Sequence, residues 1–114
     1  MKIKQINDQN FSTVLKSCDK PIVIKFYNPT CHLCSGLKPV YEQLSMMFND
    51  YEFAECNANN SRKMFKFFKV SGVPTVFIVD KDSRKEIPYP QNPDPDSGYS
   101  LYDMADFLDS FNKR

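Results

Sequence analysis

The chain has 114 residues, of which 41% are hydrophobic and 25% are charged, and its formal net charge is +1. These values suit one globular domain over residues 1–114 and leave no room for a second. They exclude the basic excess of a nucleic-acid-binding surface, and no segment reaches the ~18 consecutive apolar residues of a membrane span, so we expect neither nucleic acid nor membrane as a partner.

Apolar spacing and turn residues divide the first part of the chain into a helix and a strand. Over 10–17 the apolar residues recur at helical spacing, which predicts a short helix with Asp8 or Asn10 as its N-terminal cap. The run 22–27 is short, apolar and rich in β-branched and aromatic residues. This composition predicts a strand that is covered on both faces.

A longer helix is expected to begin at Cys31 or His32, after a break at 28–30. Pro39 lies inside the helical pattern and predicts a kink, because it removes one backbone hydrogen bond. The residues predicted for the buried side of this helix are Leu33, Leu37, Val40, Tyr41, Leu44 and Met47 or Phe48.

The rest of the chain continues the alternation and adds a hairpin. We expect strands over 51–56 and 75–79, a return strand that begins at Lys85, helices over 61–69 and 101–111, and an exposed loop over 92–98. Asn59, Asn60 or Ser61 is the expected cap of the helix over 61–69. Met46, Met47 and Met64 are predicted to be core residues. The order α-β-α-β-α-β-β-α predicts an α/β fold, with parallel strands joined by helical crossovers and an antiparallel edge.

Cys31 and Cys34 form a C-x-x-C between a predicted strand and a predicted helix. A helix N-terminus favours an anion, so we expect Cys31 to be the nucleophilic thiolate. Cys34 lies one turn further along, where it would resolve the mixed disulfide between Cys31 and a substrate. His32, if protonated, would stabilise the thiolate further; the alternative is an exposed spacer.

A zinc site is the main alternative for the cysteine pair. C-x-x-C is half of a tetrahedral site, but the other half is missing, because Cys18 and Cys56 stand alone and His32 is the sole histidine. We therefore expect no metal, and we interpret Cys18 and Cys56 as plain thiols. The chain has 3 glycines, none in a Gly-rich run, so no dinucleotide or phosphate loop and no cofactor is expected.

These residues resemble the thioredoxin and protein disulfide isomerase family. The segment Phe26-Tyr27-Asn28-Pro29-Thr30-Cys31-His32-Leu33-Cys34 looks like Phe-Tyr-Ala-Pro-Trp-Cys-x-x-Cys, and Gly72-Val73-Pro74-Thr75 looks like Gly-Ile-Pro-Thr. The resemblance implies a thioredoxin fold, a three-layer αβα arrangement around a mixed sheet of four to five strands. It also implies a cis Pro74 that shields Cys31, and a Val73 whose main chain pairs with an extended substrate.

The sequence departs from the family pattern at three places. Thr30 replaces a tryptophan, His32-Leu33 is an unusual dipeptide between the cysteines, and Lys25 stands where the family carries a buried Asp or Glu. That acid is thought to accept a proton from the second cysteine. Lys25 would stabilise a thiolate, act as a base if deprotonated, or extend its ammonium group to solvent with no catalytic role.

The sequence therefore predicts an enzyme that reduces or exchanges disulfides of protein substrates and is reset by a reductase or oxidant partner. The alternative is a thioredoxin-like binding module with a weakly active or vestigial C-x-x-C. We expect a monomer. We also expect a cytoplasmic location, because the first residues lack the apolar stretch of a secretory signal. A chain trimmed of its signal would look the same.

Overall fold

A five-stranded mixed sheet organises residues 3–112, the part of the chain that the computed structural model describes. Its strands are β1 (Ile3–Ile6), β2 (Ile22–Tyr27), β3 (Glu52–Asn57), β4 (Thr75–Asp80) and β5 (Ser83–Glu86), in the spatial order β1-β3-β2-β4-β5. β1 and β2 run parallel to β3, whereas β4 is antiparallel to β2 and β5 to β4. The expected parallel strands with an antiparallel edge are confirmed.

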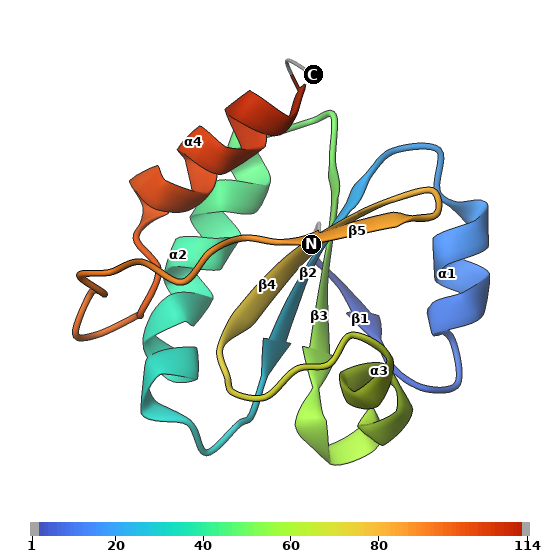
Figure 1. Ribbon diagram of the computed structural model, residues 1–114, viewed down its shortest axis with the longest axis horizontal. Helices are drawn as coiled ribbons and strands as arrows, with labels where there is room; N and C mark the ends of the chain where they lie inside the picture. The colour runs from blue at the N-terminus through green and yellow to red at the C-terminus, as the bar shows by residue number, and fades with distance from the viewer. Residues whose placement is uncertain (1–2, 113–114) are drawn as a thin grey trace.

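Helices cover both faces of the sheet (Figure 1). They are α1 (Phe11–Ser17), α2 (His32–Met47), α3 (Arg62–Phe67) and α4 (Leu101–Asn112), with a 3-10 turn, η1, over Ala58–Asn60. α2 and α4 pack together on one face, and α1 and α3 lie on the other. The result is the three-layer αβα arrangement of the thioredoxin fold. Within residues 3–112, no helix has the length and apolar character needed to cross a membrane.

Two apolar cores form because successive residues of a strand point to opposite faces of the sheet. In β2, Val23 packs under α2 and α4, whereas Ile24 and Phe26 pack under α1 and α3. Both faces of β2 are therefore buried, as its largely apolar sequence predicts. Lys25 follows the same alternation and points toward α2, which places a charged residue inside this core region.

Two features of the sequence were misread. β1 was not predicted, because Lys4 and Gln5 are exposed and the strand is defined by its pairing with β3 rather than by its own pattern. Met46 and Met47 are 68% and 53% exposed, so their placement in the core was wrong. The helix turns them away from the sheet; Met64, by contrast, is fully buried in α3.

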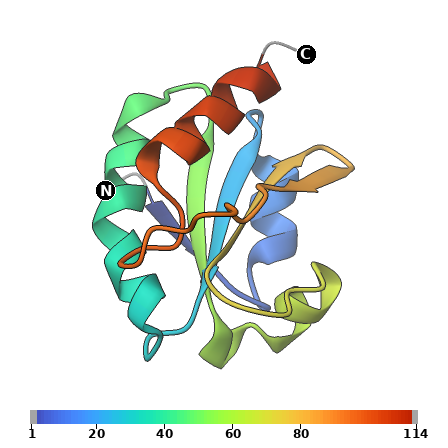
Figure 2. The same cartoon turned by 60° about the vertical axis from the view of Figure 1, so that its left-hand side comes forward.

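The segment between β5 and α4 is only partly the exposed loop that was expected. Ser97, Gly98 and Tyr99 are buried, and the Tyr99 hydroxyl donates to the Ile87 carbonyl at 3.2 Å. This segment lies against α2 (Figure 2), where a Cβ on Gly36 would come within 1.7 Å of the Asp96 carbonyl oxygen. The lack of a side chain at Gly36 thus allows the loop to pack beside the helix that carries the cysteines.

The cap of α3 comes from a distant residue. Asp8 was expected to cap α1, but its carboxylate accepts hydrogen bonds from the backbone N–H groups of Lys63 and Met64, both at 2.9 Å. Asn10 and Ser61 occupy the cap positions of α1 and α3 without a side-chain cap bond. The sequence could not show this pairing, because the residues lie more than fifty positions apart.

We expect Asp8→Ala to destabilise the domain by about 1 kcal/mol, because the substitution leaves two N–H groups of α3 without their acceptor. Urea unfolding curves of the two proteins measure the difference. Asp19→Ala, at an exposed residue, is the control. Equal unfolding midpoints for wild type and Asp8→Ala would contradict the capping role.

Candidate active site

The first cysteine is held at the start of α2 by the turn that follows β2. The Asn28 carbonyl accepts a hydrogen bond from the Cys31 N–H at 3.0 Å. The Asn28 side-chain oxygen accepts two more, from the N–H and the hydroxyl of Thr30, at 3.0 and 2.9 Å. The polar residues that replace apolar ones in this segment therefore tighten the turn and fix the backbone of Cys31.

Cys31 is the N-cap residue of α2, and its Sγ accepts a hydrogen bond from the Cys34 N–H at 3.2 Å. A sulfur at this position meets backbone N–H groups that have no partner within the helix, which stabilises negative charge. Both cysteines are free thiols. The geometry that the sequence predicts for the pair is therefore present, with Cys31 partly exposed and Cys34 4% exposed.

A third segment, the loop that precedes β4, completes the site. The Cys31 Sγ lies 3.9 Å from the Val73 carbonyl oxygen, and the Val73–Pro74 peptide bond is cis. Val73 is partly exposed, whereas Pro74 is buried. A hollow of about 300 Å³ lies beside Pro74 and is lined by 71–75, Glu86, Tyr89 and Tyr99. Cys31, Val73 and Pro74 thus lie together, the arrangement that the family resemblance implies.

Cys34 differs from Cys31 in its surroundings. Burial, and to a smaller extent the hydrogen bond with Cys31, raise the pKa of the Cys34 thiol to about 12. The backbone of Asn28 and the ammonium group of Lys25 act in the opposite direction. At neutral pH Cys34 is therefore a protonated thiol, which must lose its proton before it can attack a disulfide.

His32 and Lys25, the two residues expected to affect the cysteine thiols, differ in their exposure. His32 is exposed on the first turn of α2. Lys25 is 2% exposed, so the interpretation that its ammonium group extends to solvent was wrong. Its Nζ lies 3.2 Å from a carboxylate oxygen of Glu55 and 4.9 Å from the centre of the Tyr41 ring. The charge is paired within the domain, so it does not need to reach water.

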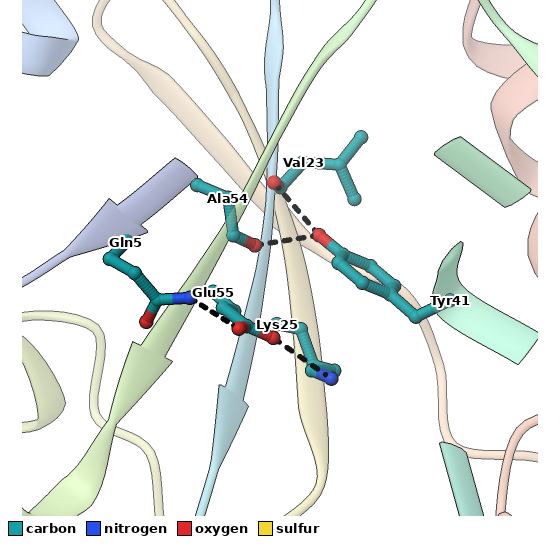
Figure 3. Close-up of polar contacts among 6 residues, drawn as sticks. All are labelled: Gln5, Val23, Lys25, Tyr41, Ala54 and Glu55. Atoms are coloured by element: carbon teal, nitrogen blue, oxygen red, sulfur yellow. Dashed lines mark hydrogen bonds and ion pairs between the residues drawn. The ribbon is translucent and has the colours of Figure 1, made fainter. Parts of the chain in front are cut away.

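Glu55 is a residue of this site that the sequence reasoning missed. It lies on β3, directly opposite Lys25 in the parallel register. Figure 3 shows its carboxylate between the Gln5 amide of β1 and the Lys25 ammonium group of β2. Above this pair, the Tyr41 hydroxyl donates to the carbonyls of Val23 and Ala54, at 3.0 and 2.7 Å. The signal available in the sequence was a glutamate within an alternating strand; its position opposite Lys25 follows from the strand register.

The two other cysteines lie apart from this site. Cys56 is fully buried beside the sulfur of Met64 at 3.5 Å, and Cys18 is partly exposed at the end of α1. Both are free thiols, and burial raises the pKa of each. No cluster of three or more metal-binding side chains is present within residues 3–112.

Ionisation of Cys56 is expected to lower the stability of the domain at alkaline pH. Burial raises the pKa of its thiol from 9.0 to about 11. Between these values the unfolded chain loses this proton while the folded chain keeps it, so stability is full below pH 9.0 and falls as pH approaches about 11. Urea midpoints under reducing conditions should decline over this range, and less steeply in Cys56→Ala. Parallel declines in the two proteins would contradict this assignment.

The three-layer fold, the C-x-x-C at the start of α2 and the cis Val73–Pro74 bond together define a thioredoxin-like domain. The family model described as Thioredoxin matches residues 2–94. The chain therefore belongs to the thioredoxin family, and the resemblance found in its motifs is confirmed.

Relatives of both branches of the family match the sequence. Protein disulfide-isomerase erp38 of Neurospora crassa is 33% identical over 92 residues, covering 77% of this chain and 25% of that protein. Protein disulfide-isomerase of Drosophila melanogaster is 28% identical over 109 residues, or 95% of this chain and 21% of the relative. The chain thus spans about a quarter of the length of these two relatives. Thioredoxin M-type, chloroplastic, of Brassica napus is 25% identical over 74% of this chain and 48% of its own length.

Solved structures show the same fold. Chloroplastic thioredoxin z aligns with a TM-score of 0.80 at 14% identity and covers 100% of this chain and 97% of its own. The first thioredoxin domain of mouse Protein disulfide-isomerase A4 aligns with a TM-score of 0.76 at 20% identity, covering 93% of this chain and 72% of its own. At these identities the likeness establishes the fold alone.

Proposed function

We propose that this domain exchanges dithiol and disulfide with protein substrates through Cys31 and Cys34. The observation that carries the proposal is the position of the Cys31 sulfur, which is partly exposed at the start of α2, 3.2 Å from the Cys34 N–H and 3.9 Å from the Val73 carbonyl oxygen. This position combines stabilisation of a thiolate with access for a second polypeptide.

The reaction has two exchange steps. The Cys31 thiolate attacks one sulfur of a substrate disulfide, which forms a mixed disulfide and releases the other sulfur as a thiolate. Cys34 then loses its proton and attacks the Cys31 sulfur, which forms the Cys31–Cys34 disulfide and releases the second substrate sulfur. The substrate gains two electrons and the domain loses two. A partner dithiol returns them, or a partner oxidant drives the cycle in the opposite direction.

The substrate chain is placed by Val73 and Pro74. Proline lacks an N–H group, while the backbone of Val73 lies at the partly exposed edge next to Cys31. An extended segment of the substrate pairs with that backbone, as strands pair at a sheet edge. Thr30 offers no flat apolar surface on the other side of the sulfur, so the main-chain contacts carry more of the binding.

Reduction of insulin by dithiothreitol tests the proposal. We expect the wild-type domain to accelerate the reduction and Cys31→Ser to abolish the acceleration, because serine cannot form the mixed disulfide. Cys18→Ser, which removes a thiol outside the site, should retain the wild-type rate. No acceleration by the wild-type domain would favour a thioredoxin-like binding module, the alternative suggested by Thr30 and Lys25. Acceleration retained by Cys31→Ser would contradict the role of Cys31.

The direction of electron flow follows from the reduction potential of the pair. We propose reduction of substrates in a reducing, cytoplasm-like compartment, where a thioredoxin-like couple near ~−270 mV is maintained as the dithiol. Equilibration with glutathione buffers of known ratio gives the potential. A value near ~−180 to −120 mV would instead assign the domain to oxidation or isomerisation.

A further inference from the structure

A buried ion pair lies beneath the second cysteine. Lys25 is 2% exposed, and its Nζ is 3.2 Å from the Glu55 carboxylate. The pair occupies the α2 side of the sheet, where Gln5 also donates to Glu55 and the Tyr41 ring covers the ammonium group at 4.9 Å (Figure 3). Burying two charges is costly, and a buried pair of this kind is weak evidence for stability.

A hollow connects the pair with the resolving cysteine. Its volume is about 230 Å³, which is enough for several water molecules. The residues that line it are Lys25, Tyr27, Asn28, Pro29, Cys34, Ser35, Lys38 and Glu55. Glu55 is the sole carboxylate in this lining, and a protonated lysine has no lone pair to accept a proton. A proton that leaves Cys34 on this side therefore meets one carboxylate.

We propose that Glu55 accepts the proton of Cys34 through water in this hollow during the resolving step, and that Lys25 positions the Glu55 carboxylate for this transfer. This inference rests on the proposed exchange reaction. It also bears on the departure at position 25: a carboxylate is supplied to the site by Glu55 of β3, which lies opposite Lys25 of β2 in the strand pairing.

The proton and electron balance of the step is complete. The S–H bond of Cys34 breaks, its proton passes through water to the Glu55 carboxylate, and the sulfur attacks the Cys31 sulfur of the mixed disulfide. The Cys31–Cys34 bond forms, the bond from Cys31 to the substrate sulfur breaks, and the substrate sulfur leaves with the electron pair. Glu55 then returns the proton to solvent through the open side of the hollow.

Several groups face Glu55 and set the pH dependence of this transfer. Lys25 and Tyr27 approach it from β2, Gln5 from β1, and Cys34, Lys38 and Tyr41 from α2. Lys25 and Lys38 are the positively charged side chains in the lining of the hollow. His32 is exposed and does not line the hollow.

Reaction with 5,5′-dithiobis(2-nitrobenzoate) separates the two steps. Attack by Cys31 releases the first nitrothiobenzoate, and attack by Cys34 on the resulting mixed disulfide releases the second. Stopped-flow absorbance records both phases as a function of pH. A Cys18→Ser background removes the partly exposed third thiol, and Cys56 is fully buried.

We expect Glu55→Gln to slow the second phase by about tenfold or more at neutral pH, and to change the first phase by less than about twofold. The second phase of the variant should also keep rising with pH into the alkaline range, because Cys34 must then ionise without an acceptor. Glu52→Gln is the matched control: it removes a carboxylate from the same strand but on the opposite face, outside the hollow.

Two further variants separate chemistry from folding. Lys25→Met with Glu55→Gln leaves no unpaired buried charge, so this protein should fold and retain the slow second phase. The charge exchange Lys25→Glu with Glu55→Lys returns a carboxylate to the hollow and should restore most of the second-phase rate. Circular dichroism and thermal unfolding confirm that each variant is folded.

The outcomes distinguish this inference from the proposed function. A folded Glu55→Gln or double variant whose second phase keeps the wild-type rate and pH profile would overturn the role of Glu55 while leaving the exchange reaction intact. Failure of the charge-exchanged protein to recover, while folded, would also count against it. Absence of a second phase in the wild-type protein would overturn the proposed function itself.

Discussion

Replacing Cys34 by serine is expected to stop turnover and to trap the domain on its substrate. Cys31 remains at the start of α2, so the first attack proceeds and a mixed disulfide forms. No second thiol within residues 3–112 lies beside Cys31, since Cys56 is buried on the opposite face of the sheet and Cys18 lies at the end of α1. The intermediate should therefore accumulate, and it can be isolated on non-reducing gels and identified by mass spectrometry.

The control for this experiment is the matching change at the first cysteine. Cys31→Ser should give no covalent complex, because Cys34 is buried and remains protonated at neutral pH, with a pKa raised to about 12 by burial. Full turnover by Cys34→Ser, or covalent complexes of equal yield from both variants, would contradict the assigned order of attack. The result tests whether Cys31 attacks the substrate and Cys34 resolves the mixed disulfide, as their different surroundings imply.

Replacing Phe26 by alanine is expected to lower the free energy of unfolding strongly. Phe26 is fully buried in β2, and its ring lies 5.2 Å from those of Phe65 and Phe68 and 5.7 Å from that of Phe77. Removing the ring leaves a cavity among three aromatic neighbours. We expect a cost of about 3–5 kcal/mol, which corresponds to a fall in Tm of roughly 10–20 °C.

Thermal unfolding followed by circular dichroism measures this effect. Tyr102→Ala is the matched control, because it also removes an aromatic ring, but one that is 79% exposed on α4. It should change the free energy of unfolding by no more than about 0.5 kcal/mol. A Phe26→Ala protein as stable as the control would show that the aromatic cluster does not support this face of the sheet.

The motifs predicted the fold and the reacting atoms because both depend on local order in the chain. A C-x-x-C between an apolar strand and a helix places one sulfur at the helix N-terminus wherever the helix packs. The alternation of strands and helices likewise restricts the topology to parallel crossovers with an antiparallel edge. The third part of the site was implied by the resemblance at Gly72-Val73-Pro74-Thr75, and its approach to Cys31 depends on the packing of β4 against β2.

The ion pair beneath Cys34 could not be predicted from the sequence. Lys25 was recognised as a departure from the family pattern, but the sequence left its side chain with three possible roles. The strand register brings Glu55 opposite it, and this pairing is decided by how β2 and β3 align. Asp8 and α3 are a second example, since the capping carboxylate comes from a residue far along the chain.

The sequence by itself determined the α/β class, the thioredoxin-like order of elements and the pair Cys31–Cys34, because periodicity, helix ends and motif spacing act over a few residues. The tertiary structure decided which buried charges neutralise one another, which residue caps α3 and how the 92–98 segment packs on Gly36. These contacts join segments that are distant in the chain. Their partners become defined when the apolar faces of the helices are buried against the sheet and the strands take their register.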